Sequence, residues 1–191
     1  MIKTNMGAIM RKCRTQLGII GLGNVLMGDD ALGPHTVALL ASRWEWPDSV
    51  ALLDLGTPGP ELAQLMLPFE TVVVVDSVNT GAQPGSVARI GHSELTAAPE
   101  PGTRTPHDPG LVMAMRQLEL TGDGPAEITL LGVVPENLDT GAGLSPTVRA
   151  ALPALLEAVV AEAASHAIIP KKRAFPLPEN LWWEPLPADT E

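Results

Sequence analysis

The sequence predicts an α/β fold, a three-layer sandwich whose mostly parallel central sheet has helices on both faces. The first observation is the run at residues 71–76, which places four consecutive valines before an aspartate. Such a run of β-branched residues is typical of a parallel strand that is covered on both faces. The second observation is that short apolar runs alternate along the chain with segments of helical spacing. This alternation favours parallel pairing with helices on both sides of the sheet.

The first predicted strand is residues 17–22, an apolar run that contains and is followed by glycines. Gly21 and Gly23 allow the backbone to turn sharply, and the loop then carries two adjacent carboxylates, Asp29 and Asp30. Pro34 suits the first position of a helix, which we expect to end near residue 43. Because ligands of open α/β sheets bind at the carboxyl ends of strands, this loop is the first candidate for a functional site.

The remaining elements continue the alternation of strands and helices. We expect strands at residues 50–54, 71–76 and 128–134, the last of these being the final strand, and an antiparallel edge strand at 86–90. We expect a short helix near 62–66 and another at 110–118. A last helix should start at Ser145-Pro146 and run to about residue 165. Pro153 lies inside it, where a proline kinks or breaks a helix.

The length of 191 residues suits one domain. We place a single α/β domain at 17–167, after a flexible extension at 1–16 and before a tail at 168–191 that is rich in proline and contains tryptophan. Prolines prevent regular structure in this tail. Its adjacent indoles, Trp182 and Trp183, leave two alternatives, a mobile tail or a strap that docks on the domain or on a partner.

The charge and cysteine content exclude several classes of function. A net charge of −10 without a basic stripe argues against nucleic acid and anionic membranes as partners. The single cysteine, Cys13, excludes an internal disulfide framework and fits a reducing compartment. We find neither a signal-peptide pattern nor an apolar run long enough to span a membrane. We therefore expect a cytoplasmic protein without membrane insertion.

A dinucleotide-binding turn is a weak alternative for the first loop. Leu26 stands where the third glycine of that fingerprint would let the helix approach the strand closely. Asp29 and Asp30 would also place negative charge where a pyrophosphate has to sit.

Three residues form the candidate site: Asp30 after the first strand, Asp76 at the end of the valine strand, and His107 in a loop before a helix. If these two strands are neighbours, all three residues converge at the carboxyl edge of the sheet. Two carboxylates and an imidazole suit a divalent metal such as zinc or nickel, with positions left open. Without a metal, two close carboxylates would have separated pKa values and could act as an acid–base pair.

The other polar residues rank lower as site residues. We expect Asp29 to be structural, and Asp54 to hold its own turn or to lie behind the site. His35 ranks well below His107 as a ligand. We expect His92 and His166 on the solvated surface.

Several motifs in register resemble the nickel-iron hydrogenase maturation endopeptidases. The similarity covers residues 17–166, and the start at Ser145-Pro146-Thr147 is similar to that of the family's last helix. Asp30 stands where some members carry glutamate, and Ala31 where glycine is frequent. The matching motifs are Gly21-x-Gly23-Asn24-x-Leu26-x-x-Asp29-Asp30-x-x-Gly33, Leu53-Asp54-x-Gly56-Thr57, Val75-Asp76, Pro106-His107 and Leu131-Gly-Val-x-Pro-Glu136.

The resemblance implies a processing endopeptidase. Members remove a short C-terminal extension from the precursor of the hydrogenase large subunit after nickel has been inserted, and they cut after the basic residue that closes the nickel-binding cysteine motif. The family's metal-contacting residues carry over to Asp30, Asp76 and His107, which would serve both metal contact and catalysis. Nickel would then arrive with the substrate, and no permanent organic cofactor is implied. A monomer that docks the precursor is the simplest expectation.

A protein of another class would carry the same three residues. A non-catalytic chaperone that senses the metal could bind the precursor and leave the cut to another protease. The nucleophile also stays unassigned, because no serine or cysteine of the sequence stands beside an evident base.

Overall fold

A computed structural model of the chain describes residues 15–97 and 108–184. Its central sheet has five strands in the order β3-β1-β4-β6-β5. The first four strands of this order are mutually parallel, and β5 pairs antiparallel with β6 at the edge. This arrangement confirms the predicted mostly parallel sheet and its antiparallel edge strand. The bounds are β1 (Thr15–Leu22), β3 (Val50–Gly56), β4 (Phe69–Ser77), β5 (Val87–Ile90) and β6 (Glu127–Val133).

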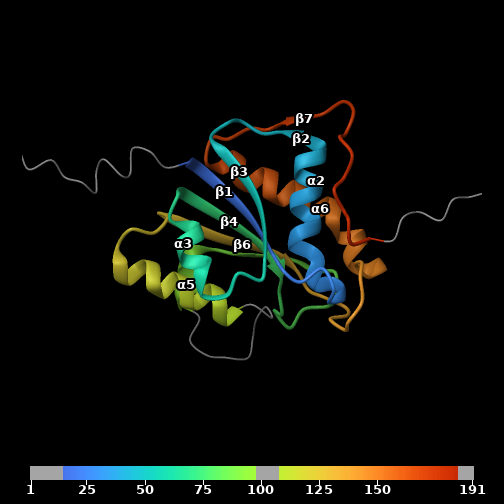
Figure 1. The fold of residues 1–191 in the computed structure, drawn as a ribbon, viewed down its shortest axis with the longest axis horizontal. Coiled ribbons are helices and arrows are strands. Elements are labelled where there is room, and N and C mark those ends of the chain that lie inside the picture. The colour runs from blue at the N-terminus through green and yellow to red at the C-terminus, as the bar shows by residue number, and fades with distance from the viewer. Residues whose placement is uncertain (1–14, 98–107, 185–191) are drawn as a thin grey trace, which may run out of the picture.

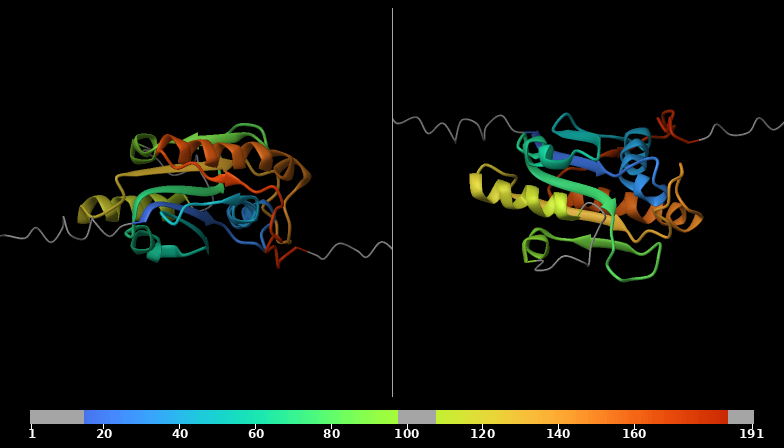
Figure 2. Two further views of the ribbon diagram at one scale, coloured as in Figure 1. Left: turned by 90° about the horizontal axis from the view of Figure 1, so that it is seen from above. Right: turned by 60° about the horizontal axis from the view of Figure 1, so that its bottom comes forward.

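Helices cover both faces of the sheet, as Figures 1 and 2 show. One face carries α2 (Leu32–Arg43) and α6 (Pro146–Ser165), and the other carries α3 (Leu62–Met66), α4 (His92–Ala97) and α5 (Asp108–Thr121). Two short 3-10 turns, η1 (Gly28–Ala31) and η2 (Gly59–Glu61), precede α2 and α3. None of the helices within the described ranges is long and apolar enough to cross a membrane.

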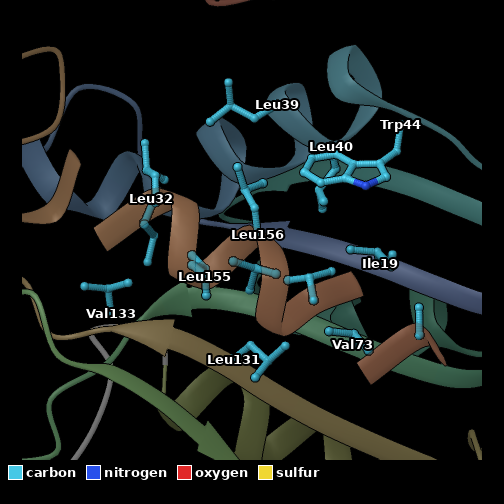
Figure 3. Packing of buried hydrophobic residues seen from close by; sticks show 14 of the residues in the cluster. Ile19, Leu32, Leu39, Leu40, Trp44, Val73, Leu131, Val133, Leu155 and Leu156 are labelled. Carbon is cyan, nitrogen blue, oxygen red and sulfur yellow. The ribbon is translucent and has the colours of Figure 1, made fainter. Parts of the chain in front are cut away.

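The core consists of two hydrophobic clusters because successive strand residues point to opposite faces. Ile19, Val73 and Leu131 pack with Leu40 and Leu155 of the helices α2 and α6 (Figure 3). Their strand neighbours, which include Ile20, Val74 and Leu130, pack against α3 and α5. The valine run of β4 is therefore buried on both sides, as its composition predicted.

Three details differ from the prediction. The helix α2 begins at Leu32 because η1 leads directly into it, so Pro34 occupies the first turn, where a missing N–H leaves no helical bond unmade. Pro153 does not break α6, which continues to Ser165 with Leu155 and Leu156 buried beyond it. The short strands β2 (Trp44–Glu45) and β7 (Lys171–Lys172) were not predicted, and β7 follows the strand that we expected to be the last.

The segment 168–184, which we call the strap, lies against α2. The strand β7 pairs antiparallel with β2. Farther along, the Leu177 N–H donates to the Ser42 carbonyl oxygen at 3.0 Å, and Trp183 is buried. Figure 1 shows the strap in red, running beside α2 from the end of the helix toward its beginning. Of the two alternatives for the tail, the described part has the docked arrangement.

Candidate active site

The structure brings Asp30 and Asp76 to the same edge of the sheet. The strands β1 and β4 are parallel neighbours with Gly21 opposite Val75, as the predicted crevice requires. Asp76 lies near the end of β4, and Asp30 lies in η1, which follows the end of β1. The exposed fractions of Asp30 and Asp76 are only 5% and 1%. Two buried acids thus occupy the carboxyl edge, where open α/β sheets bind their ligands.

Ser77 contacts both of these carboxylates. Its hydroxyl donates to Asp30 Oδ1 at 3.3 Å, and its backbone N–H donates to Asp76 Oδ1 at 2.7 Å. The backbone N–H of Asn24 donates to the other oxygen of Asp30 at 2.8 Å. Sequence reasoning missed Ser77, although its place directly after a strand-end aspartate was a usable signal. These bonds fix the orientation of both carboxylates.

Glycines let the first loop fold tightly over the strand ends. Gly23 has a φ of +134°, and a Cβ there would lie 1.7 Å from the carbonyl oxygen of Asp30. Gly33 lies at the start of α2, and a Cβ there would lie 2.1 Å from the carbonyl oxygen of Leu22. A side chain at Gly23 would push η1, and with it Asp30, away from the sheet, and a side chain at Gly33 would push the start of α2 away from it.

Asp29 has the structural role that the sequence predicted. Its carboxylate accepts hydrogen bonds from the backbone N–H groups of Glu136, Asn137 and Ser145, at 2.8, 2.9 and 2.6 Å. Ser145 is also the N-cap of α6, where its hydroxyl accepts a bond from the Val148 N–H. Asp29 therefore connects the first loop to the loop between β6 and α6.

His107, the third predicted site residue, lies outside the described residues. The described helix α5 begins immediately after it, at Asp108. This helix contacts η2, which follows the carboxyl end of β3, and it precedes β6, which runs parallel to β4. The helix α5 therefore returns the chain from the carboxyl edge of the sheet, where Asp30 and Asp76 lie, to the amino edge.

A second group of potential metal ligands lies at the amino edge. Glu127, Glu162 and His166 bring ligand atoms within 4.8 Å of one another. Glu162 already accepts two bonds from Arg89, at 2.7 and 2.9 Å, and one from the Thr129 hydroxyl at 2.8 Å. The bonds from Arg89 lower the pKa of Glu162 despite its burial. We interpret this group as an ion-pair network that fastens α6 to β5 and β6.

The histidines outside the candidate site differ from the prediction. His92 Nδ1 accepts a bond from the Ile128 N–H at 3.2 Å, and His166 is half-buried with Nε2 3.9 Å from Glu162. Neither is a solvated surface residue, because His92 begins α4 and bonds to the start of β6, and His166 is the C-cap of α6 beside Glu162. His92 also lines a hollow of about 470 Å³ with Glu70 and Glu119. That hollow lies at the amino edge, far from the two buried acids in the fold.

His35 is fully buried, and both of its ring nitrogens contact the strap. Its Nε2 lies 2.8 Å from Glu184 Oε1, and Trp183 Nε1 donates to its Nδ1 at 3.3 Å. Burial lowers the pKa of His35, although the carboxylate of Glu184 opposes this shift. The neutral tautomer with hydrogen on Nε2 satisfies both contacts. His35 therefore anchors the strap.

Asp54 holds its own turn, one of the two roles considered for it. Its Oδ1 accepts a bond from the Gly56 N–H at 3.0 Å at the exposed end of β3.

A family model described as "Hydrogenase maturation protease" matches residues 34–162. The hydrogenase 2 maturation protease of Escherichia coli (strain K12) is 35% identical over 143 residues, which are 75% of this chain and 87% of that protein. The hydrogenase expression/formation protein HoxM of Azotobacter vinelandii is 31% identical over 156 residues, or 81% of this chain and 75% of that protein.

Solved structures agree with the sequence comparison. The hydrogenase maturating endopeptidase HybD from E. coli superposes with a TM-score of 0.76 at 33% identity, covering 83% of this chain and 98% of that chain. The [NiFe] hydrogenase maturation protease HybD from Thermococcus kodakarensis gives a TM-score of 0.63 at 25% identity, covering 78% of this chain and 99% of that chain.

Proposed function

Since the chain belongs to the hydrogenase maturation protease family, we propose that it removes the C-terminal extension of a nickel-iron hydrogenase large-subunit precursor after nickel insertion. The observation that carries the proposal is the pair of buried acids, Asp30 and Asp76, which Ser77 joins at the carboxyl edge of the sheet. The names of the relatives support a protease rather than a chaperone.

In this proposal, Asp30, Asp76 and His107 contact nickel that the substrate carries. Carboxylate oxygens and imidazole nitrogen are ligands that nickel accepts. Three such groups leave positions for the ligands that the precursor itself provides. Nickel is therefore part of the substrate, and the protease needs no resident cofactor for this step.

The contact with nickel links metal insertion to cleavage. Nickel would polarise the carbonyl of the scissile peptide bond or activate the attacking water, and a carboxylate oxygen of Asp30 or Asp76 that is not bound to the metal would serve as the base. Water adds to the carbonyl carbon, the C–N bond breaks, and the amine of the released extension takes up the proton. Ser77 is fully buried and bonded to Asp30, so we assign it a positioning role.

The remaining expectations belong to the same proposal. We propose that the protein works in the cytoplasm as a monomer that docks the precursor. The net charge of −10 argues against nucleic acid and anionic membranes as partners.

The test is a cleavage assay on nickel-loaded and nickel-free precursor, with the C-terminus of the product read by mass spectrometry. We expect the wild type to release a short C-terminal peptide from the loaded form alone, and the Asp76→Asn and His107→Ala variants to leave it intact. A Glu162→Gln variant, changed in the amino-edge network, is the matched control and should keep the nickel requirement. Binding of the precursor without any cleavage would overturn the proposal in favour of a chaperone.

A further inference from the structure

A hollow of about 360 Å³ opens beside the loop that carries Asp30. The backbone N–H of Asn24, one of its lining residues, donates to the Asp30 carboxylate, so the hollow lies one peptide unit from the candidate site. A neighbouring hollow of about 350 Å³ shares Pro34, Asp54 and Trp182 and extends along α2. The lining residues of the first hollow are Gly23, Asn24, Val25, Pro34, Asp54, Gly56, Thr57 and Trp182.

The strap holds Trp182 in the wall of this hollow. The next residue, Trp183, is buried and donates to His35, and Glu184 accepts hydrogen bonds from both His35 and Arg149. The rings of Trp182 and Trp183 form a T-shaped pair with 5.6 Å between their centroids. Trp182 itself is 73% exposed, so its indole is accessible to a ligand.

The chemistry of the hollow suits a positive charge. Asp54 is an exposed carboxylate at the end of β3 and lines the hollow together with the indole of Trp182. The face of an indole attracts a cation, and a carboxylate on the same hollow adds to the attraction. The net charge of −10 on the chain also favours a positively charged ligand.

We propose that this hollow binds a basic side chain of the substrate polypeptide, next to the segment that is cleaved, and that Trp182 is a specificity-determining residue. The inference rests on the proposed function, because it takes the precursor as the occupant. The strap follows the part of the chain that the family model matches, residues 34–162. Trp182 therefore lines the hollow from a segment that lies outside the residues that the family model matches.

The test compares cleavage of nickel-loaded precursor by the wild type and by Trp182→Ala, Trp182→Phe and Phe175→Ala variants of the full chain. Trp182→Ala should raise KM about fivefold, which is the size of one exposed cation–π contact. It should leave kcat within about twofold of the wild-type value. Trp182→Phe, which keeps an aromatic face, should restore part of the affinity. Phe175 is 87% exposed on the same strap and does not line the hollow, so its variant should match the wild type.

A second precursor identifies which group occupies the hollow. In it, the basic residues that flank the cleavage point are replaced by glutamine, and its nickel content is verified before the assay. The wild type should lose affinity for it, and Trp182→Ala should cause no further loss. An unchanged KM for Trp182→Ala, or an equal loss with both precursors, would overturn the inference while the proposed function stands. Failure of the wild type to cleave either precursor would instead overturn the proposed function, and the inference with it.

Discussion

Ser77 donates its hydroxyl hydrogen to Asp30 Oδ1 across 3.3 Å and so connects the end of β4 to the turn that follows β1. The same residue donates its backbone N–H to Asp76. The hydroxyl bond can be removed by mutation, whereas the backbone bond stays. The contribution of the hydroxyl to the site can therefore be measured separately.

The Ser77→Ala variant should lower kcat for precursor cleavage about tenfold, because Asp30 loses a donor that orients it and a bond to a charged group contributes about 1.5–3 kcal/mol. Steady-state kinetics on loaded precursor measures this change. Ser165→Ala removes a hydroxyl bonded only to the backbone of α6 and should leave kcat unchanged. Equal kcat values for the wild type and Ser77→Ala would contradict the positioning role.

The Asp29→Ala variant should lose about 3 kcal/mol of unfolding free energy, because its carboxylate serves the backbone N–H groups of Glu136, Asn137 and Ser145. Urea denaturation measures the loss. Asp139→Ala removes an exposed carboxylate from the same loop and should change stability by less than about 0.5 kcal/mol. A similar small change for Asp29→Ala would show that these bonds are replaced by water.

The Gly33→Ala variant should be severely destabilised, because its Cβ would lie 2.1 Å from a backbone oxygen of β1 that has no room to move. Gly110→Ala is the matched control, since a Cβ there meets nothing within 4 Å and alanine favours the helix. This control should keep or raise the melting temperature, with a gain of up to about 1 kcal/mol. Wild-type stability of Gly33→Ala would disprove the tight packing of the start of α2 on β1.

Acidification should weaken the fold through His35. Burial lowers the pKa of His35 below its ordinary value of 6.5, and the charge of Arg149 adds to this, while Glu184 opposes it. The unfolded chain therefore binds a proton that the folded chain does not, so this contribution is present above pH 6.5 and is lost as the pH falls below it. Between about pH 7.5 and 5.5, the unfolding free energy of the wild type should fall more steeply than that of His35→Gln. If the unfolding free energies of the wild type and His35→Gln change equally with pH over this range, the assignment is refuted.

Much of the fold could be predicted because its signals are local. The valine run of β4 and the capped start of α6 at Ser145 each specify their element within a few residues, and the structure confirms both. The convergence of Asp30 and Asp76 was predicted only on the condition that β1 and β4 are neighbours, and the structure meets this condition.

The contacts of the strap could not be predicted in this way. His35 meets Glu184 across 149 positions of sequence, and no local pattern marks a pair that only the docked chain brings together. For the same reason the sequence does not show that His92 bonds to the start of β6 or that His166 lies beside Glu162. The role of His107 remains a prediction from the sequence.

The central claim is that the two buried acids contact nickel carried by the precursor. The most direct measurement is the affinity of loaded and nickel-free precursor for the wild type and for Asp76→Asn, by calorimetry at a temperature where cleavage is slow. The account predicts that the wild type binds the loaded form at least about tenfold more tightly, a coupling of about 1.4 kcal/mol, and that Asp76→Asn binds both forms alike. An Asp76→Asn variant that discriminates as well as the wild type would contradict it.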